Sequence, residues 1–213
     1  QKILESKVEN ENKNKRIPRS HRETILILSL IHSFKGNGDL AKKLAKRGTY
    51  LGDKLNSPFI KAVSYMRLGH AEQLIKLNNL NSARKAYKKS LEIINTFNIP
   101  RGKAEPLMGL ALLEGFYGDT QSGLKYAKKG LSISKEAGDE WLSAILNFSI
   151  GINHYFENKL QKAEEIFLNN IVSFEKLNDN FLKMINRLWL SLIYLDKDKS
   201  NKFQITTEKL FTT

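Results

Sequence analysis

The chain has 213 residues, no cysteine and a formal net charge of +13 at pH 7. The absence of cysteine excludes disulfides, thiol catalysis and cysteine-bound metals, and it fits a cytoplasmic protein. No apolar run approaches the ~18 residues of a membrane span, because the longest, Ile25–Ile31, contains Ser29 and is followed by His32. The composition therefore favours a globular chain that does not cross a membrane.

Residues 1–20 are rich in Lys, Glu and Asn and end at Ile17-Pro18-Arg19-Ser20. They contain neither the apolar core nor the cleavage site of a signal peptide. We expect this segment to be the remnant of a preceding helix followed by a linker. The chain does not begin with Met, which is compatible with a fragment of a longer protein.

From Arg22 onward, small residues and turn formers recur at a spacing of about 40 residues. Small residues are needed where two helix backbones approach closely, and Gly and Asn tolerate the left-handed conformation that ends a helix. The small residues that open the second helix of each pair are Ala41, Ala83, Gly123 and Ala163. Those midway along the first helices are Ser29, Ala71, Ala111, Gly151 and Ser191. The turn formers are Gly36, Asn78, Gly118, Asn158 and Asp198.

Three residue columns with one spacing predict an all-α repeat solenoid, a right-handed superhelix of four helix pairs and an incomplete fifth. The segment 104–138 is the best-preserved pair, with its turn at Gly118. The solenoid is predicted over residues 21–195. In the fifth copy Phe203 replaces the small anchor, so 196–213 is predicted to be a partial repeat or a capping helix.

The columns resemble the tetratricopeptide (TPR) repeat, which has a small residue midway along its first helix and an Ala that opens the second. Two further TPR-like columns follow the anchors, and they read Ala45/Gly48, Tyr87/Ser90, Ala127/Gly130 and Phe167/Asn170. The period of about 40 residues exceeds the usual 34. We attribute the difference to longer helices.

The longer repeats resemble the sensor solenoids of large ATP-dependent bacterial regulators, the type of the maltose-regulon activator and its LuxR-like relatives. The segments that carry the likeness are 101–105, 109–110, 118–119, 129–131 and 137–141. Such regulators combine the sensor with an ATPase module and a DNA-binding helix-turn-helix, and neither is visible in this sequence. The resemblance implies a sensor or interaction domain, with nucleic-acid contacts made only by other domains of the parent protein.

No motif predicts catalysis, a metal or a cofactor. Residues Gly36–Ala41 match G-x-G-x-x-A, but a dinucleotide site also requires a preceding strand and an acidic residue about 20 positions later. Asp53 comes too early, and the repeat register already accounts for both ends of the match. The four histidines lack metal-ligand spacing, and His32 and His154 share a repeat position typical of packing residues. We therefore predict a protein that is not an enzyme.

The first helices carry the candidate binding residues, because in stacked pairs they line the concave groove where solenoids bind partners. Tyr65, Met108, Phe148 and Tyr155 would form an apolar to aromatic trough. The recurring polar residues beside them would border the groove, since an unpaired buried charge is costly. The predicted ligand- or peptide-binding residues are Tyr65, Arg67, Leu68, Glu105, Met108, Asn147, Phe148, Tyr155 and Arg187. Packing between repeats is an equally open role for the aromatic residues.

The second helices of three successive pairs carry basic residues at equivalent positions, which predicts a basic stripe on the outer, convex side. The stripe consists of Lys46, Arg47, Lys88, Lys89, Lys128 and Lys129. Glu164-Glu165 interrupts it in the fourth pair. The stripe is either a solvated helix face or a docking surface for an acidic partner, such as nucleic acid or another domain of the polypeptide. Aromatic residues do not alternate with the lysines, which disfavours a single-strand platform.

The predicted function is a non-catalytic binding module, the sensor or interaction domain of a bacterial transcriptional regulator. Its partner would be a protein, a peptide or another domain of the regulator, and a small-molecule effector is also open. The alternative is a structural adaptor that holds protein partners and binds no small molecule. Asp139 is predicted to cap the helix that follows it, and Trp141 to seal the junction between two repeats.

Overall fold

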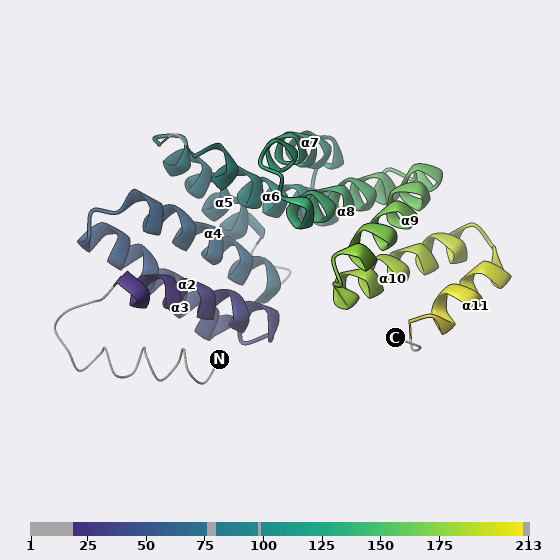
Figure 1. Ribbon diagram of the computed structural model, residues 1–213, viewed down its shortest axis with the longest axis horizontal. Helices are drawn as coiled ribbons and strands as arrows, with labels where there is room; N and C mark the ends of the chain where they lie inside the picture. Colours follow the sequence, from purple (N-terminus) through teal and green to yellow (C-terminus); the bar gives the residue numbers. More distant parts are fainter. Residues whose placement is uncertain (1–18, 76–79, 98, 211–213) are drawn as a thin grey trace. The chain divides into compact units, whose positions relative to one another are not determined.

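The computed structural model describes residues 19–75, 80–97 and 99–210, and every regular element in these ranges is helical (Figure 1). The first helices of the pairs are α2 (Arg19–Phe34), α4 (Pro58–Ile75), α6 (Ala104–Tyr117), α8 (Glu140–Phe156) and α10 (Asn180–Asp196). The second helices are α3 (Gly38–Lys54), α5 (Leu80–Ile94), α7 (Thr120–Glu136), α9 (Leu160–Lys176) and α11 (Ser200–Glu208). A 3₁₀ turn, η1 (Pro100–Lys103), precedes α6. The predicted all-α fold of helix pairs is confirmed.

Most of the predicted turn formers adopt the left-handed conformation. Gly36, Asn158 and Asp198 have φ values of 75°, 59° and 53°. Gly118 lies in the turn between α6 and α7, but it is not among the residues with positive φ. There Asp119 starts α7 instead, because its side chain accepts a hydrogen bond from the Gln121 backbone N–H at 2.9 Å. Asn78 lies outside the described residues.

The small-residue columns lie where the helices of a pair touch. Ala41, Ala83 and Ala163 are fully buried, and Gly123 is also buried. In the first pair, Ser29 Oγ donates a hydrogen bond to the Ala41 carbonyl at 2.8 Å, which links α2 directly to α3. The predicted register of the repeats is therefore confirmed.

Large side chains fill the space that the glycines leave open. Tyr87 of α5 is fully buried against both Gly69 of α4 and Gly109 of α6. A Cβ atom at Gly69 would lie 2.5 Å from Tyr87 Cε1, closer than side chains approach. In the same way, a Cβ atom at Gly151 would lie 2.7 Å from Phe167 Cε1. The aromatic column after the anchors thus requires glycines on the neighbouring first helices.

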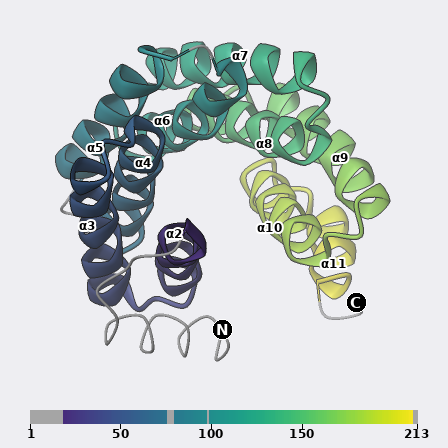
Figure 2. The same ribbon diagram turned by 60° about the vertical axis from the view of Figure 1, so that its left-hand side comes forward.

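The chain forms two compact units, Gln1–Gly109 and Leu110–Thr213, with the boundary inside α6. In the first unit, α4 packs against α2, α3 and α5, as the turned view shows (Figure 2). In the second unit, α8 packs against α7 and α9, and α10 packs against α9 and α11. No helix in the described ranges has both the length and the hydropathy of a membrane span.

The two ends of the solenoid differ in detail from the sequence-based expectation. Helix α2 begins at Arg19, so Arg19 and Ser20 are helical, whereas the sequence predicts a linker up to residue 20. At the other end, α11 has 9 residues, whereas the other second helices have 15 to 17. Phe203 is only partly buried, unlike Ala163 at the equivalent position. The final pair therefore differs from the others in the length of its second helix and in the burial of its anchor residue.

We predict that Gly123→Ala destabilises the protein by roughly 1–3 kcal/mol through overpacking. A Cβ atom at this position would overlap Asn153 Oδ1. Asn153 does not turn away freely, because its Nδ2 donates to the carbonyls of Ala111 (3.1 Å) and Ser149 (2.7 Å). Urea unfolding followed by circular dichroism measures the change.

The matched control is Gly102→Ala, where the nearest atom to a new Cβ lies at 3.6 Å. We expect this variant to unfold like the wild type. Helix propensity alone predicts that Gly123→Ala stabilises the protein by about 0.5–1 kcal/mol. An increase of that size would show that Gly123 is not a contact point.

Candidate functional site

The predicted binding residues lie on the first helices and fall into two groups, one in each unit. The group in the first unit comprises Tyr65, Arg67, Leu68, Glu105 and Met108, on α4 and α6. The group in the second unit comprises Asn147, Phe148, Tyr155 and Arg187, on α8 and α10. Each group has a different chemical character.

An ion pair between Arg67 and Glu105 joins α4 to α6 in the first unit. The Arg67 side chain is 13% exposed and that of Glu105 is 32% exposed. Arg67 Nη1 also lies 3.3 Å from His70 Nδ1, to which it donates a hydrogen bond. The nearly buried guanidinium is therefore partnered, which explains how it is tolerated at this depth.

His70, which contacts Arg67, and its neighbour Tyr87 are buried beside this ion pair. Their rings meet edge to face with centroids 5.5 Å apart, and Tyr87 Oη donates to Gln73 Oε1 at 2.8 Å. Burial lowers the pKa of His70 from 6.5 to about 4 and raises the pKa of Tyr87 well above 10. Both side chains are thus neutral at physiological pH. His70 Nε2 and Arg67 Nε have no hydrogen-bond partner among the described residues.

Five aromatic side chains from α6, α8 and α10 form a cluster in the second unit, the aromatic patch. They are Phe116, Tyr117, Tyr155, Phe156 and Trp189. Ring centroids are 5.7 Å apart for Phe116–Phe156 and Phe116–Trp189, and 5.2 Å for Tyr155–Trp189. Tyr117 is 41% exposed and Phe156 is 46% exposed. The patch therefore presents aromatic surface that the described part of the chain leaves uncovered.

Tyr155 gives the aromatic patch a polar edge. Its hydroxyl donates a hydrogen bond to Asp196 Oδ2 at 2.7 Å. Burial and this carboxylate together raise the pKa of Tyr155 to about 12. The phenol therefore remains protonated and holds the end of α10 against α8.

The other residues predicted in the second unit have structural contacts. Phe148 is 8% exposed and belongs to a core cluster with Ile152 and Phe167, so it lies in the core and does not line an open trough. Arg187 Nη1 donates to the Lys209 carbonyl at 2.9 Å, which connects α10 to the end of α11. Asn147 is partly buried on α8.

Sequence reasoning missed four members of the aromatic patch: Phe116, Tyr117, Phe156 and Trp189. A signal for two of them was present, because Phe116 and Phe156 occupy the same position in successive repeats. Phe116 comes directly after Gly115, and Phe156 comes directly after Tyr155, so the two phenylalanines form a repeat column of their own. Trp189 had no repeat signal, since that position holds a small residue in α4, α6 and α8.

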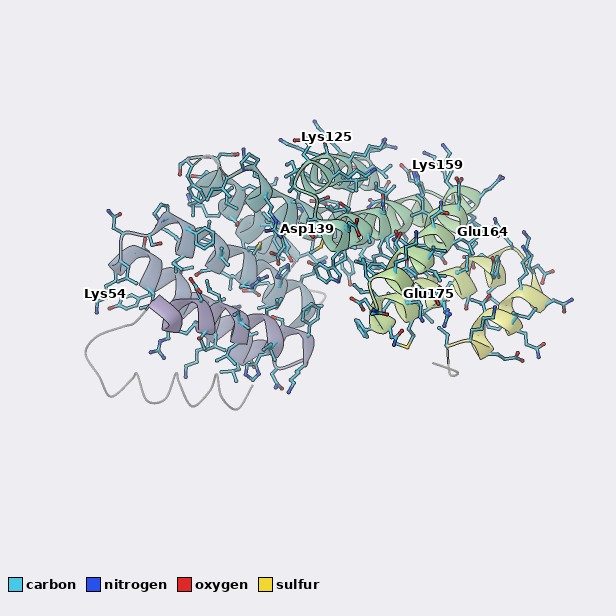
Figure 3. All side chains as sticks on the ribbon, viewed as in Figure 1. Lys54, Lys125, Asp139, Lys159, Glu164 and Glu175 are labelled. Atoms are coloured by element: carbon cyan, nitrogen blue, oxygen red, sulfur yellow. The ribbon has the colours of Figure 1, made fainter. Side chains whose placement is uncertain are left out.

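Trp141 links two neighbouring pairs, as predicted. Its Nε1 donates to Asp179 Oδ2 at 2.9 Å, and Asp179 caps α10 by accepting from the Leu182 N–H. Asp139, labelled in Figure 3 at the start of α8, accepts from the Leu142 N–H at 3.1 Å. The predicted cap at Asp139 is confirmed.

The basic residues predicted on the second helices are in solvent contact. Lys46, Lys88, Lys128 and Lys129 are exposed, and Arg47 and Lys89 are partly buried. Lys89 forms an ion pair with Glu92 at 2.8 Å. In the described ranges, no group of three or more His, Asp or Glu side chains is arranged to hold a metal ion.

We predict that His70 makes the protein less stable in mild acid. Unfolding returns the pKa of His70 from about 4 to 6.5, so between these pH values the unfolded chain binds a proton that the folded chain rejects. The free energy of unfolding should therefore fall as the pH drops from 6.5 to 4, by up to about 3 kcal/mol. Urea unfolding at pH 7.5 and pH 4.5 measures the loss.

The His70→Asn variant should lose most of this pH dependence. His154→Asn is the control. Burial also lowers the pKa of His154, but His154 is less buried and Glu157 Oε2, at 3.3 Å, opposes the shift, so this variant should lose less of the pH dependence. Two results would contradict the inference that His70 is buried and neutral. One is the same pH dependence of the unfolding free energy in wild type and His70→Asn, and the other is a His70 ring that titrates near pH 6.5 by NMR.

Neither a protein-family model nor a curated protein sequence matches the chain. Solved structures match it at low sequence identity. The structure of a Rap protein complexed with Competence and Sporulation Factor has a TM-score of 0.80 and 15% identity over 94% of this chain and 56% of that chain. A STAND ATPase with a tetratricopeptide repeat sensor from Pyrococcus horikoshii has a TM-score of 0.72 and 18% identity, over 97% and 32% of the two chains.

A putative kinesin light chain with TPR-like repeats from Podosopora anserina matches with a TM-score of 0.66 and 12% identity, over 92% of this chain and 95% of that one. The chain thus spans about half of the Rap protein and about a third of the STAND protein. At these identities the similarity concerns the fold. The chain has the fold of the TPR-like helical-repeat solenoids.

Proposed function

We propose that this chain is a binding module for a protein or peptide, and that the aromatic patch of the second unit is its contact surface. The observation that carries the proposal is the exposed aromatic cluster formed by three successive first helices. Aromatic side chains dominate the energetics of protein interfaces, because each supplies a large rigid contact area with little loss of side-chain entropy.

The chemistry of the patch suits an apolar or aromatic anchor on the ligand. Phe116 and Trp189 are partly buried and form the floor, whereas Tyr117 and Phe156 remain exposed. Trp189 meets Tyr155 and Phe156 edge to face, with centroid distances of 5.2 and 6.1 Å. This arrangement leaves ring faces on which a ligand side chain can stack. Asp196 accepts from Tyr155 beside the rings and supplies an acceptor for a backbone N–H of the ligand.

The fold similarities support this role. The Rap protein, which matches 94% of this chain, was solved in complex with a factor. The STAND ATPase carries its tetratricopeptide repeats as a sensor within a longer protein. By this analogy, the chain is the sensor or interaction domain of a bacterial regulator in the cytoplasm, with no catalytic role of its own.

In this proposal, the ligand acts by differential affinity. A ligand that binds the patch more tightly in one state of the parent protein shifts the population toward that state. Binding energy of about 1.4 kcal/mol in favour of one state changes the ratio of states tenfold.

Tryptophan fluorescence tests the proposal, because the chain has two tryptophans and only Trp189 belongs to the aromatic patch. Trp141→Phe leaves Trp189 as the only tryptophan reporter. We would select linear peptides from a random library against the immobilised chain and titrate them into this variant. We expect the Trp189 emission to change on binding, and Phe156→Ala to weaken binding at least tenfold.

The matched control is Leu168→Ala on α9, which removes an equally exposed apolar side chain (44%, against 46% for Phe156) outside the patch. We expect peptide binding to survive this change. If selected peptides bind Phe156→Ala like wild type, or bind without altering Trp189 emission, the patch is not the contact surface. The alternative function, a structural adaptor, predicts binding of folded protein partners. Metabolites would then not raise the melting temperature of the protein.

A further inference from the structure

Positive charge is concentrated on three of the second helices. Helix α3 contains five basic and two acidic residues, and α5 and α7 each contain four basic residues and one acidic residue. The first helices carry few charges, and α6 has two acidic residues and no basic one. The net charge of the chain therefore does not spread evenly over its surface but follows the helix type.

Most lysines of these helices have no acidic partner within the described part of the chain. Lys42 pairs with Glu72 and Lys89 with Glu92. Two sets of exposed lysines form no ion pair with the described part of the chain, and we call each set a lysine patch. The patch of the first unit is Lys43, Lys46, Lys85 and Lys88, and that of the second unit is Lys125, Lys128 and Lys129. Lys125, labelled in Figure 3, projects outward from α7.

Helices α5 and α7 also lack exposed apolar surface, whereas α3 exposes Leu40 and Tyr50. Neither α5 nor α7, both described in full, exposes a large hydrophobic side chain. Helix α9 of the second unit differs in both respects, since it exposes Leu168 and Val172 and carries three glutamates. Lysine-rich surface without apolar anchors is thus a specific property of α5 and α7.

We propose that the lysine patches bind the phosphate backbone of double-stranded nucleic acid without sequence selectivity. Protein interfaces are depleted in Lys and depend on aromatic or apolar anchors, which α5 and α7 do not expose. Nucleic-acid interfaces are polar and strongly positive. An anionic membrane would require apolar side chains to insert, and single strands would require exposed aromatic platforms.

The proposal is independent of peptide binding at the aromatic patch, because the two surfaces lie on different helices. It also differs from the expectation that only other domains of a parent protein contact nucleic acid. That expectation relied on the absence of a DNA-binding motif, whereas backbone binding needs none. Each phosphate neutralised by a lysine releases counterions, so the affinity must fall steeply with salt.

Fluorescence anisotropy with a labelled 24-base-pair DNA duplex of arbitrary sequence tests the proposal at NaCl concentrations from 50 to 300 mM. We expect log Kd to depend linearly on log salt concentration. The variant Lys125→Gln/Lys128→Gln/Lys129→Gln should lower the slope by roughly 2 to 3, since each phosphate contact contributes about 0.9. The corresponding substitution of the four lysines in the first unit should lower it by roughly 3 to 4.

The matched control is Lys162→Gln/Lys176→Gln/Lys199→Gln, which removes the same charge from exposed positions outside the lysine patches. We expect the salt slope of this control to fall by at most one-third as much as the slope of the α7 variant. Circular dichroism establishes that all variants are folded. An acidic 24-residue peptide and phosphatidylserine vesicles serve as competing polyanions.

Three results would overturn the proposal. One is the absence of duplex binding by the folded wild type at 50 mM NaCl. Another is an equal loss of slope in the control and in the α7 variant, which would mean that net charge alone attracts the duplex. The third is preferential binding of the acidic peptide or the vesicles, which would assign the lysines to a protein or a membrane.

Discussion

The close approach of neighbouring helices is the constraint on which the rest of this structure depends. Tyr87 is accommodated only because Gly69 and Gly109 have no side chain on the surfaces that face its ring. In the second unit, Gly123 and Gly115 leave room for the Asn153 amide, whose Nδ2 binds the Ala111 carbonyl of α6. Helices packed this closely fix which residues are buried, and thereby which remain for binding.

Buried polar groups are satisfied largely within this packing and seldom serve as sites. At Arg67, Glu105 and His70 both bind the Nη1 end of the guanidinium group, while its Nε has no hydrogen-bond partner among the described residues. Asn170 similarly donates its Nδ2 to the Ala144 carbonyl of the preceding helix. Such contacts stabilise the register of the repeats, since an unpartnered polar group at this depth would be costly. Surface features are therefore the better guide to function.

The two kinds of helix divide the proposed functions between them. First helices of the second unit gather aromatic rings from three repeats, whereas the second helices α5 and α7 carry lysines and expose no large apolar side chain. Aromatic rings favour a partner with apolar anchors, and lysines favour a polyanion. One repeat architecture thus offers two surfaces of different chemistry.

The sequence by itself determined the helix pairs, their register and the type of fold, because small residues and turn formers act locally and recur with one period. It also placed the cap Asp139 correctly, since capping depends on neighbours in the chain. It did not separate Phe148 from Phe156, which lie on the same helix. Phe148 is buried by Phe167 and Ile193, whereas Phe156 is left exposed beside Trp189. Only the tertiary structure decided this, because the burial of a side chain depends on residues that lie far from it in the sequence.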